Sequence, residues 1–166
     1  PTGRPTGCRL VRSPRVSAGT PTALAVGLEE STLARVRAEL EPGGFTVVAI
    51  PEPDGSVLGT CHVALLAEPT AGGEAPSWRD QLSALHSTRP ELAAVLLTPD
   101  PRSLWVTGAL RNRRLSHAVH TEFRAGELIA ACLAADELGI LRYEVTEQRR
   151  LSQQRLEVMA TLGEVT

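Results

Sequence analysis

The sequence predicts an α/β domain in which a parallel sheet is covered by helices on both faces. Short apolar runs rich in strand-forming residues alternate with segments of helical period, which is typical of doubly wound domains. The run His62–Ala67 is apolar after its first residue and ends at Glu68-Pro69, as expected for a central strand buried on both faces. Ligands bind to such sheets at the carboxyl ends of the strands, so the residues there indicate the function.

Length and composition limit the chain to one ordinary core. It has 166 residues, of which 42% are apolar and 22% are charged. The formal net charge of -2 provides no basic field for nucleic acid, and the apolar runs are far shorter than the roughly 18 residues of a membrane span. The three cysteines have no C-x-x-C spacing, which predicts reduced thiols in a cytoplasmic protein.

The sequence contains no familiar motif for a cofactor or a metal. No G-x-G-x-x-G follows the first predicted strand, and neither a phosphate-binding loop nor a nucleophile elbow occurs. His117 and His120 form an H-x-x-H pair, but side chains on a strand alternate between faces, so these imidazoles are expected to point apart. We therefore predict no cofactor and no metal site.

The elements follow one another in a regular order. The first helix is predicted to start at Glu30 and to stop before Pro42-Gly43-Gly44, because glycine and proline end helices. After the second strand, Pro51–Gly55 leaves room only for a short or distorted second helix. Strands are predicted at Thr22–Gly27, Phe45–Ile50, His62–Ala67, Leu92–Thr98 and His117–Thr121.

Two further helices precede the last strand. Pro76-Ser77 is predicted to open the third helix, which runs to about His86, and Asp100-Pro101 to open the fourth with the aspartate as its cap. Trp78 and Trp105 lie at helical spacing among apolar neighbours, so both are expected to pack in the core. The fourth helix closes at the basic residues Arg111, Arg113 and Arg114.

Both ends of the chain extend beyond the predicted domain. Residues 1–21, rich in Gly, Pro and Arg, are interpreted as a disordered arm or linker. The last helix is expected to begin near Arg124, and no proline interrupts it up to Val165. Because the chain starts with Pro1 and stops inside this helical pattern, it is interpreted as an excerpt of a longer protein.

Four stretches at the predicted strand ends follow the order of a known family. Val26–Glu30 stands where that family has Val-Asp-Asp-Glu-Pro, and Leu65–Ala67 where it has Leu-Leu-Asp. Val95–Thr98 matches a strand ending in a switch Thr or Ser, and Val119–Phe123 lies where Leu-Thr-Lys-Pro-Phe is usual. Residues 22–138 thus resemble the receiver domain of bacterial response regulators. The resemblance implies a flavodoxin-like (βα)5 fold with strand order 2-1-3-4-5.

The sequence departs from that family at the residues that carry out its chemistry. Phosphoryl transfer to a receiver needs a carboxylate nucleophile, acids that hold a divalent cation, and a cationic clamp. Thr98 alone matches the family, and the resemblance therefore implies a non-catalytic pseudo-receiver. Glu29 and Glu68 remain as weak candidates for binding a cation. The degenerate pocket positions are Gly27, Leu28, Ala67, Thr98 and Thr121.

A second resemblance covers the end of the chain, Arg155–Val165. It is similar to the segment that leads into the phosphoacceptor helix of sensor histidine kinases of the nitrogen-regulatory class. This resemblance implies that residues 139–166 start a kinase dimerisation helix, with kinase domains in the same chain and a response regulator as a further partner. A homodimer seam is expected at Leu141, Val145, Met159 and Leu162.

Alternatives to this reading of the function remain open at this point. The receiver-like domain, residues 22–138, is also compatible with another output, such as a transcription-activating ATPase. It is further compatible with a site that still accepts a phosphoryl group or binds a cation through Glu29 and Glu68, or with an unrelated small α/β enzyme.

Overall fold

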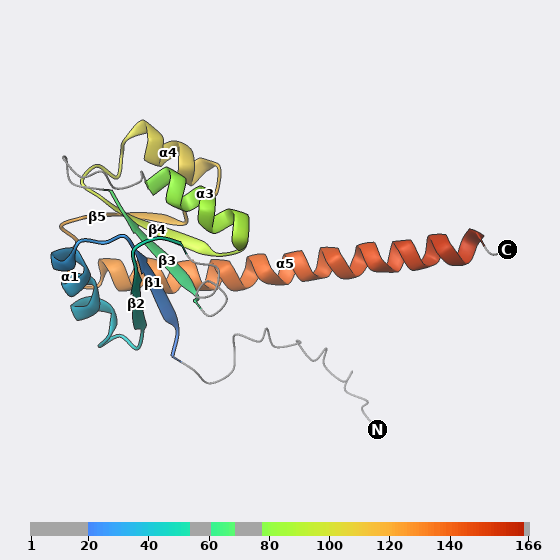
Figure 1. Cartoon of the computed structure of the whole chain (residues 1–166), viewed down its shortest axis with the longest axis horizontal. Coiled ribbons are helices and arrows are strands. Elements are labelled where there is room, and N and C mark those ends of the chain that lie inside the picture. Colours follow the sequence, from blue (N-terminus) through green and yellow to red (C-terminus); the bar gives the residue numbers. More distant parts are fainter. Residues whose placement is uncertain (1–19, 54–60, 69–77, 165–166) are drawn as a thin grey trace, which may run out of the picture.

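A five-stranded parallel sheet forms the centre of the computed structural model, which describes residues 20–53, 61–68 and 78–164 (Figure 1). The strand order is β2-β1-β3-β4-β5, and each neighbouring pair is parallel. The predicted α/β flavodoxin-like architecture is therefore confirmed. The strands are β1 (Thr22–Val26), β2 (Thr46–Ile50), β3 (Val63–Ala67), β4 (Ala93–Thr98) and β5 (His117–His120).

The alternation of side chains along each strand divides the core into two layers. In β3, Leu65 belongs to the apolar cluster on one face of the sheet, and Leu66 belongs to the cluster on the other. All six residues of β4 are buried in the same manner. Continuous apolar runs predicted these two strands correctly because both of their faces are covered.

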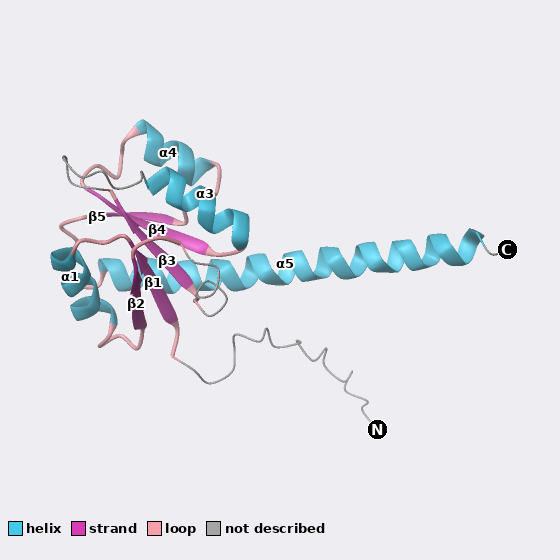
Figure 2. Cartoon of the chain, in the orientation of Figure 1, coloured by secondary structure: helices cyan, strands magenta, loops and turns pink. Residues whose placement is uncertain are grey.

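Helices cover the two faces of the sheet in pairs (Figure 2). One face carries α1 (Glu30–Leu40) and α5 (Glu127–Glu164), and the other carries α3 (Trp78–Thr88) and α4 (Leu104–Arg111). Leucine side chains of α1 and α5 complete the first layer, and those of α3 complete the second.

The predicted start of α4 is wrong by one turn. The Asp100 side chain accepts a hydrogen bond from the Arg102 amide at 3.2 Å, and the Asp100 carbonyl accepts one from the Ser103 amide. Asp100 therefore organises a turn, as aspartate often does when it bonds to a nearby amide. Ser103 is the N-cap instead, since its hydroxyl accepts a hydrogen bond from the amide of Val106.

Trp78 packs in the core as predicted, whereas the prediction for Trp105 is wrong. The indole of Trp105 is 67% exposed, and Trp78 is only 6% exposed. The short helix α4 turns Val106 toward the sheet, and this leaves its neighbour Trp105 facing outward. Apolar spacing alone does not fix which side of an eight-residue helix is buried.

The last helix is continuous from Glu127 to Glu164 and changes character along its length. It begins three residues after the predicted start at Arg124, because the amide of Glu127 bonds to the Arg124 carbonyl in a turn and Gly126 has a φ of +88°. Its buried residues end at Gly139. In Figure 1 the remainder projects away from the domain as a single rod.

Among the residues that the structure describes, no helix has the length and hydrophobicity needed to cross a bilayer. Several features predicted from the sequence lie outside the described residues. These are positions 1–19 of the N-terminal arm, most of the short second helix, the loop 69–73 and the helix start at 76–77.

Candidate functional site

The strand order brings the receiver-like positions to one edge of the sheet. Gly27 directly follows β1, Ala67 ends β3, Thr98 ends β4, and Thr121 directly follows β5. Hydrogen bonds between neighbouring strands continue across this edge. The amide of Thr121 donates to the Thr98 carbonyl at 3.0 Å, and the amide of Glu68 donates to the Leu97 carbonyl at 2.9 Å.

Gly27 occupies the position of the first acid of receivers, and its backbone conformation disfavours a residue with a side chain. Its φ is +63°, a conformation that side-chain-bearing residues rarely adopt, and its amide donates to the Ile50 carbonyl at 2.8 Å. A Cβ atom at this position would lie 2.8 Å from Nε2 of Gln81, which is a buried side chain of α3. Leu28 is half-buried and packs against the layer of α1 and α5.

The hydroxyl of Thr98 both donates and accepts a hydrogen bond within the protein. Thr98 is fully buried, and its Oγ1 donates a short hydrogen bond to the carboxylate of Glu68. The same oxygen accepts a hydrogen bond from the amide of Asp100 at 3.2 Å. Since a hydroxyl has one proton to donate, Glu68 takes the hydrogen bond that a phosphoryl oxygen would need from this side chain.

The guanidinium of Arg35, a residue of α1, reaches the carboxyl edge of the sheet. Nη1 of Arg35 donates to the Thr121 carbonyl at 3.0 Å, and it lies 3.8 Å from a carboxylate oxygen of Glu122. The guanidinium also stacks on the ring of Phe123, 4.7 Å from its centroid. Arg35 thus holds the segment after β5. Sequence reasoning missed this residue because the hydrogen-bonded partners are 86 positions apart.

The charged groups at this edge do not form an evident cation site. Glu29 is an exposed residue at the start of α1, and Glu68 is exposed apart from its hydrogen bond to Thr98. Within the described part of the chain, no three His, Cys, Asp or Glu side chains are grouped so that they could hold a metal ion. The imidazole of His120 accepts a hydrogen bond from the Glu122 amide at 2.9 Å.

Both cysteines in the described part of the chain are buried thiols with little reactivity. Burial raises the pKa of Cys61 to about 11 and that of Cys132 to about 12, so the nucleophilic thiolate is scarce at neutral pH. Burial also raises the pKa of Asp136 on α5, although the nearby His62 opposes this effect. None of these groups lies at the carboxyl edge of the sheet.

Comparison with known proteins identifies the fold. A signal receiver domain of an HD domain-containing protein from Pseudomonas fluorescens Pf-5 superposes with a TM-score of 0.58 at 20% identity, over 72% of this chain and 97% of that one. A CheY-like response regulator receiver domain from Methanospirillum hungatei JF-1 gives 0.57 at 15% identity, over 73% and 97%. The fold is that of a response-regulator receiver domain.

NtrX from Brucella abortus also matches, with a TM-score of 0.63 and 18% identity over 82% of this chain and 34% of that one. No family profile matches the sequence. No curated protein matches it either. At identities this low, the structural matches show a shared fold alone. The chemistry of this chain therefore has to be argued from its own residues at the carboxyl edge of the sheet.

Proposed function

We propose that residues 22–138 form a non-catalytic receiver-like module, a pseudo-receiver, that regulates an attached cytoplasmic histidine kinase through α5. The observation that supports this most directly is the geometry at Gly27. A metal-holding acid there would have to adopt a φ of +63° and displace the buried Gln81 side chain. The backbone conformation at this position therefore disfavours an acid, in addition to the replacement of the residue itself.

The other parts of a phosphoacceptor site are missing as well. Ala67 at the end of β3 has no nucleophile, and the proton of the Thr98 hydroxyl is given to Glu68. Arg35 does bring positive charge to this edge, but it is occupied by the Thr121 carbonyl, Glu122 and Phe123. Phosphoryl transfer depends on positioning and charge stabilisation, so a site lacking these parts has no route to the reaction.

The exposed half of α5 supports an output through helix pairing. Beyond Gly139, apolar side chains occupy first and fourth heptad positions, but the polar residues Gln148, Ser152 and Arg155 interrupt them. Leu151 and Val158 add a third position per heptad, a width more typical of a helical bundle than of a simple two-stranded seam. The exposed apolar residues of this half are Leu141, Val145, Leu151, Leu156, Val158, Met159 and Leu162.

This face supports the kinase interpretation of the segment Arg155–Val165. A dimerisation helix of a kinase has to bury such a face against other helices, and a parallel homodimer is the simplest way to do so. A receiver-like domain at the start of the helix is then able to bias its rotation or register. A cognate response regulator would receive its phosphoryl group from the attached kinase domains.

The test is phosphorylation of the 166-residue chain by acetyl phosphate and Mg²⁺, followed by intact mass spectrometry. We expect no adduct on the wild type, and none on Ala67→Asp, because an acid at β3 would still face Gly27 and Leu28 without a metal. A competent receiver domain is the positive control. A stoichiometric adduct on the wild type would overturn the proposal.

An alternative function has one specific observation in its favour. The carboxylate of Glu68 accepts a hydrogen bond from the hydroxyl of Thr98, which stands at the switch position of receivers. Glu68 itself is exposed to solvent. If Glu68 with Glu29 formed a cation-assisted phosphoacceptor, Glu68→Gln would abolish the adduct seen on the wild type. The kinase and a transcription-activating ATPase are distinguished by reading the gene beyond the codon for Thr166. A kinase requires a phosphoacceptor histidine there, and its absence would favour the ATPase.

A further inference from the structure

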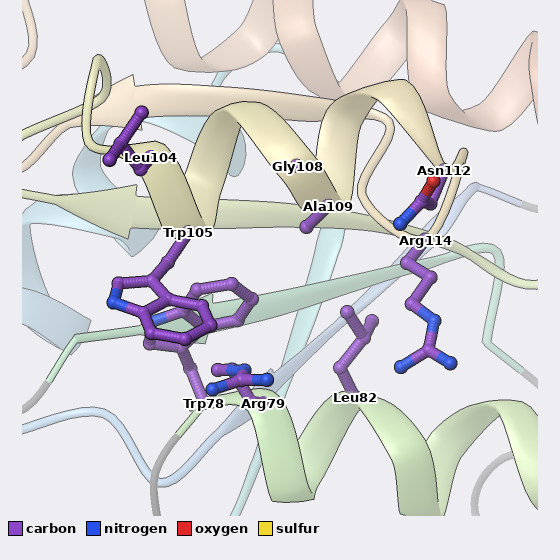
Figure 3. Close-up of a pocket in the computed structure, with 9 residues that line it drawn as sticks. All are labelled: Trp78, Arg79, Leu82, Leu104, Trp105, Gly108, Ala109, Asn112 and Arg114. Atoms are coloured by element: carbon purple, nitrogen blue, oxygen red, sulfur yellow. The ribbon is translucent and has the colours of Figure 1, made fainter.

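A groove between α3 and α4 lies on the face of the sheet opposite α1 and α5. Figure 3 shows the groove with its lining side chains, and its volume is about 480 Å³. The side chains of Leu82 and Ala109 project into its middle. It is lined by Trp78, Arg79, Leu82, Leu104, Trp105, Gly108, Ala109, Asn112 and Arg114.

The groove exposes large apolar side chains that the fold does not use. Leu104 is 90% exposed and Trp105 is 67% exposed, whereas the buried side chain of α4 is Val106. The guanidinium of Arg79 lies over the Trp105 ring, 4.3 Å from its centroid, and links the two helices. A stacked guanidinium keeps its N–H edge free for a planar anion, so Arg79 offers both a ring platform and a donor edge.

Positive charge lies at both ends of this apolar surface. In Figure 3, Arg79 is at the end where the two helices begin, and Arg114 is at the other end beside Asn112. None of the described residues that line the groove is acidic. The charge pattern therefore favours an occupant with two negative groups separated by an apolar segment.

We propose that this groove binds a short acidic peptide segment of a partner protein, with two carboxylates flanking an apolar side chain. Trp105 and the C-cap Asn112 are seven positions apart on α4, which corresponds to about 10 Å at 1.5 Å per residue. An extended peptide covers that length in roughly three residues. Because side chains of an extended peptide alternate between its two sides, the preferred sequence has acids at positions i and i+4 and an aliphatic residue at i+2, so that all three face the groove.

A peptide suits this groove better than a small ligand. Small-molecule sites enclose about 70–90% of their ligand, whereas Leu104 and Trp105 stand outward on the rim. Tryptophan and arginine are the residues most enriched among those that dominate the energy of protein interfaces. The proposal is independent of the kinase hypothesis, because the groove and α5 lie on opposite faces of the sheet (Figure 1).

The tryptophans of this chain report on the groove directly. The sequence contains two tryptophans, and both line it. A peptide with the core Glu-Ser-Leu-Ser-Glu and no aromatic residue, titrated into the 166-residue chain, should shift the Trp105 emission to the blue as the indole loses water. We expect a dissociation constant on the order of 100 μM, as is reasonable for a short flexible ligand. Peptides with Lys-Ser-Leu-Ser-Lys and Glu-Ser-Ser-Ser-Glu cores are the charge and hydrophobicity controls.

Matched variants locate the binding site. Arg79→Gln and Arg114→Gln should each weaken the acidic peptide by about three- to fivefold, as expected for partly exposed ion pairs. Arg111→Gln removes a charge from the same helix outside the groove and should leave affinity unchanged. Circular dichroism of each variant checks that it is folded.

Several outcomes would overturn the proposal. They are no shift at millimolar acidic peptide, equal binding of the lysine peptide, and equal weakening by Arg111→Gln. A shift produced by phosphatidylglycerol vesicles but not by the acidic peptide would assign the groove to a membrane surface instead.

Discussion

The two halves of α5 belong to one continuous helix but depend on different partners. Up to Gly139, the helix buries small residues such as Ala131 and Ala135, which allow its backbone to approach the sheet closely. Beyond Leu141, large side chains such as Met159 and Leu162 remain 69% and 65% exposed. The first half is therefore stabilised within the chain, whereas the second half has an apolar face that no described part of the chain covers.

This difference predicts that equivalent substitutions have very different effects on the domain. Leu66→Ala, at the centre of β3, should lower the free energy of unfolding by about 2–5 kcal/mol, because it leaves a cavity in a fully buried layer. Leu156→Ala, on the exposed half of α5, is the matched control and should change it by less than about 0.5 kcal/mol. Urea denaturation followed by circular dichroism measures both. Similar losses for the two variants would mean that β3 is not central.

The sheet could be predicted from the sequence because its signal is local. Runs such as Ala93–Leu97 are apolar throughout, and their β-branched and aliphatic residues identify strands without knowledge of their neighbours. The strand order came from the receiver resemblance, and the structure confirmed it. The edge that carries Gly27, Ala67, Thr98 and Thr121 follows from the order of the strands alone.

The chemistry at that edge could not be predicted, because it depends on contacts between distant residues. Gln81 fills the space over Gly27 from α3, and Arg35 reaches Thr121 from α1. Periodicity assigns each of these side chains to a helix without revealing what it touches. The prediction for Trp105 failed for the same reason, since its exposure depends on how a short helix is rotated against the sheet.

Arg35 holds the segment that connects β5 to α5, and its contacts offer a second way to test the packed part of the molecule. Arg35→Gln removes a hydrogen bond to Thr121, an ion pair with Glu122 and the contact with the Phe123 ring. We expect a loss of about 0.5–1.5 kcal/mol in unfolding free energy, since these groups are partly exposed. Hydrogen exchange should also become faster in residues 121–126.

The matched control is Arg37→Gln, an exposed arginine of the same helix, which should leave both the stability and the exchange unchanged. Unaltered exchange at 121–126 in the Arg35 variant would show that the Arg35 contacts do not hold the segment that leads into α5.

Asp136 makes the packed half of α5 sensitive to pH. One carboxylate oxygen is buried without a hydrogen-bond partner among the described residues, and burial raises its pKa above the ordinary 3.8. The folded state therefore holds this proton to higher pH than the unfolded chain, so the stability falls as the pH rises through the interval between the two pKa values. His62 reduces the shift and Glu137 adds to it.

Asp136→Asn should accordingly stabilise the chain at neutral pH by about 0.5–1 kcal/mol, after allowance for solvent screening of a partly exposed group. The advantage should vanish in acid, where the wild-type carboxyl is also neutral. Thermal unfolding from acid to neutral pH measures this difference in stability, and Glu157→Gln on the exposed half of α5 is the control. An advantage that persists undiminished in acid would exclude ionisation as its cause.

Substitutions in the exposed half of α5 are expected to change the stability of the domain least. They should change the self-association of the chain instead. Replacing Met159 and Leu162 with glutamate places like charges across the proposed seam, and their exposure in the single chain means that no packing is lost. We expect the unfolding transition of the sheet to be unchanged, and self-association to disappear in sedimentation equilibrium. The wild type should be monomeric when dilute and dimeric when concentrated, because Gln148 and Ser152 weaken the seam. If the wild type stayed monomeric at every concentration, or the dimer were indifferent to the two glutamates, α5 would not be the route of the signal. Only the faces of the domain itself, including the groove between α3 and α4, would then be available to transmit it.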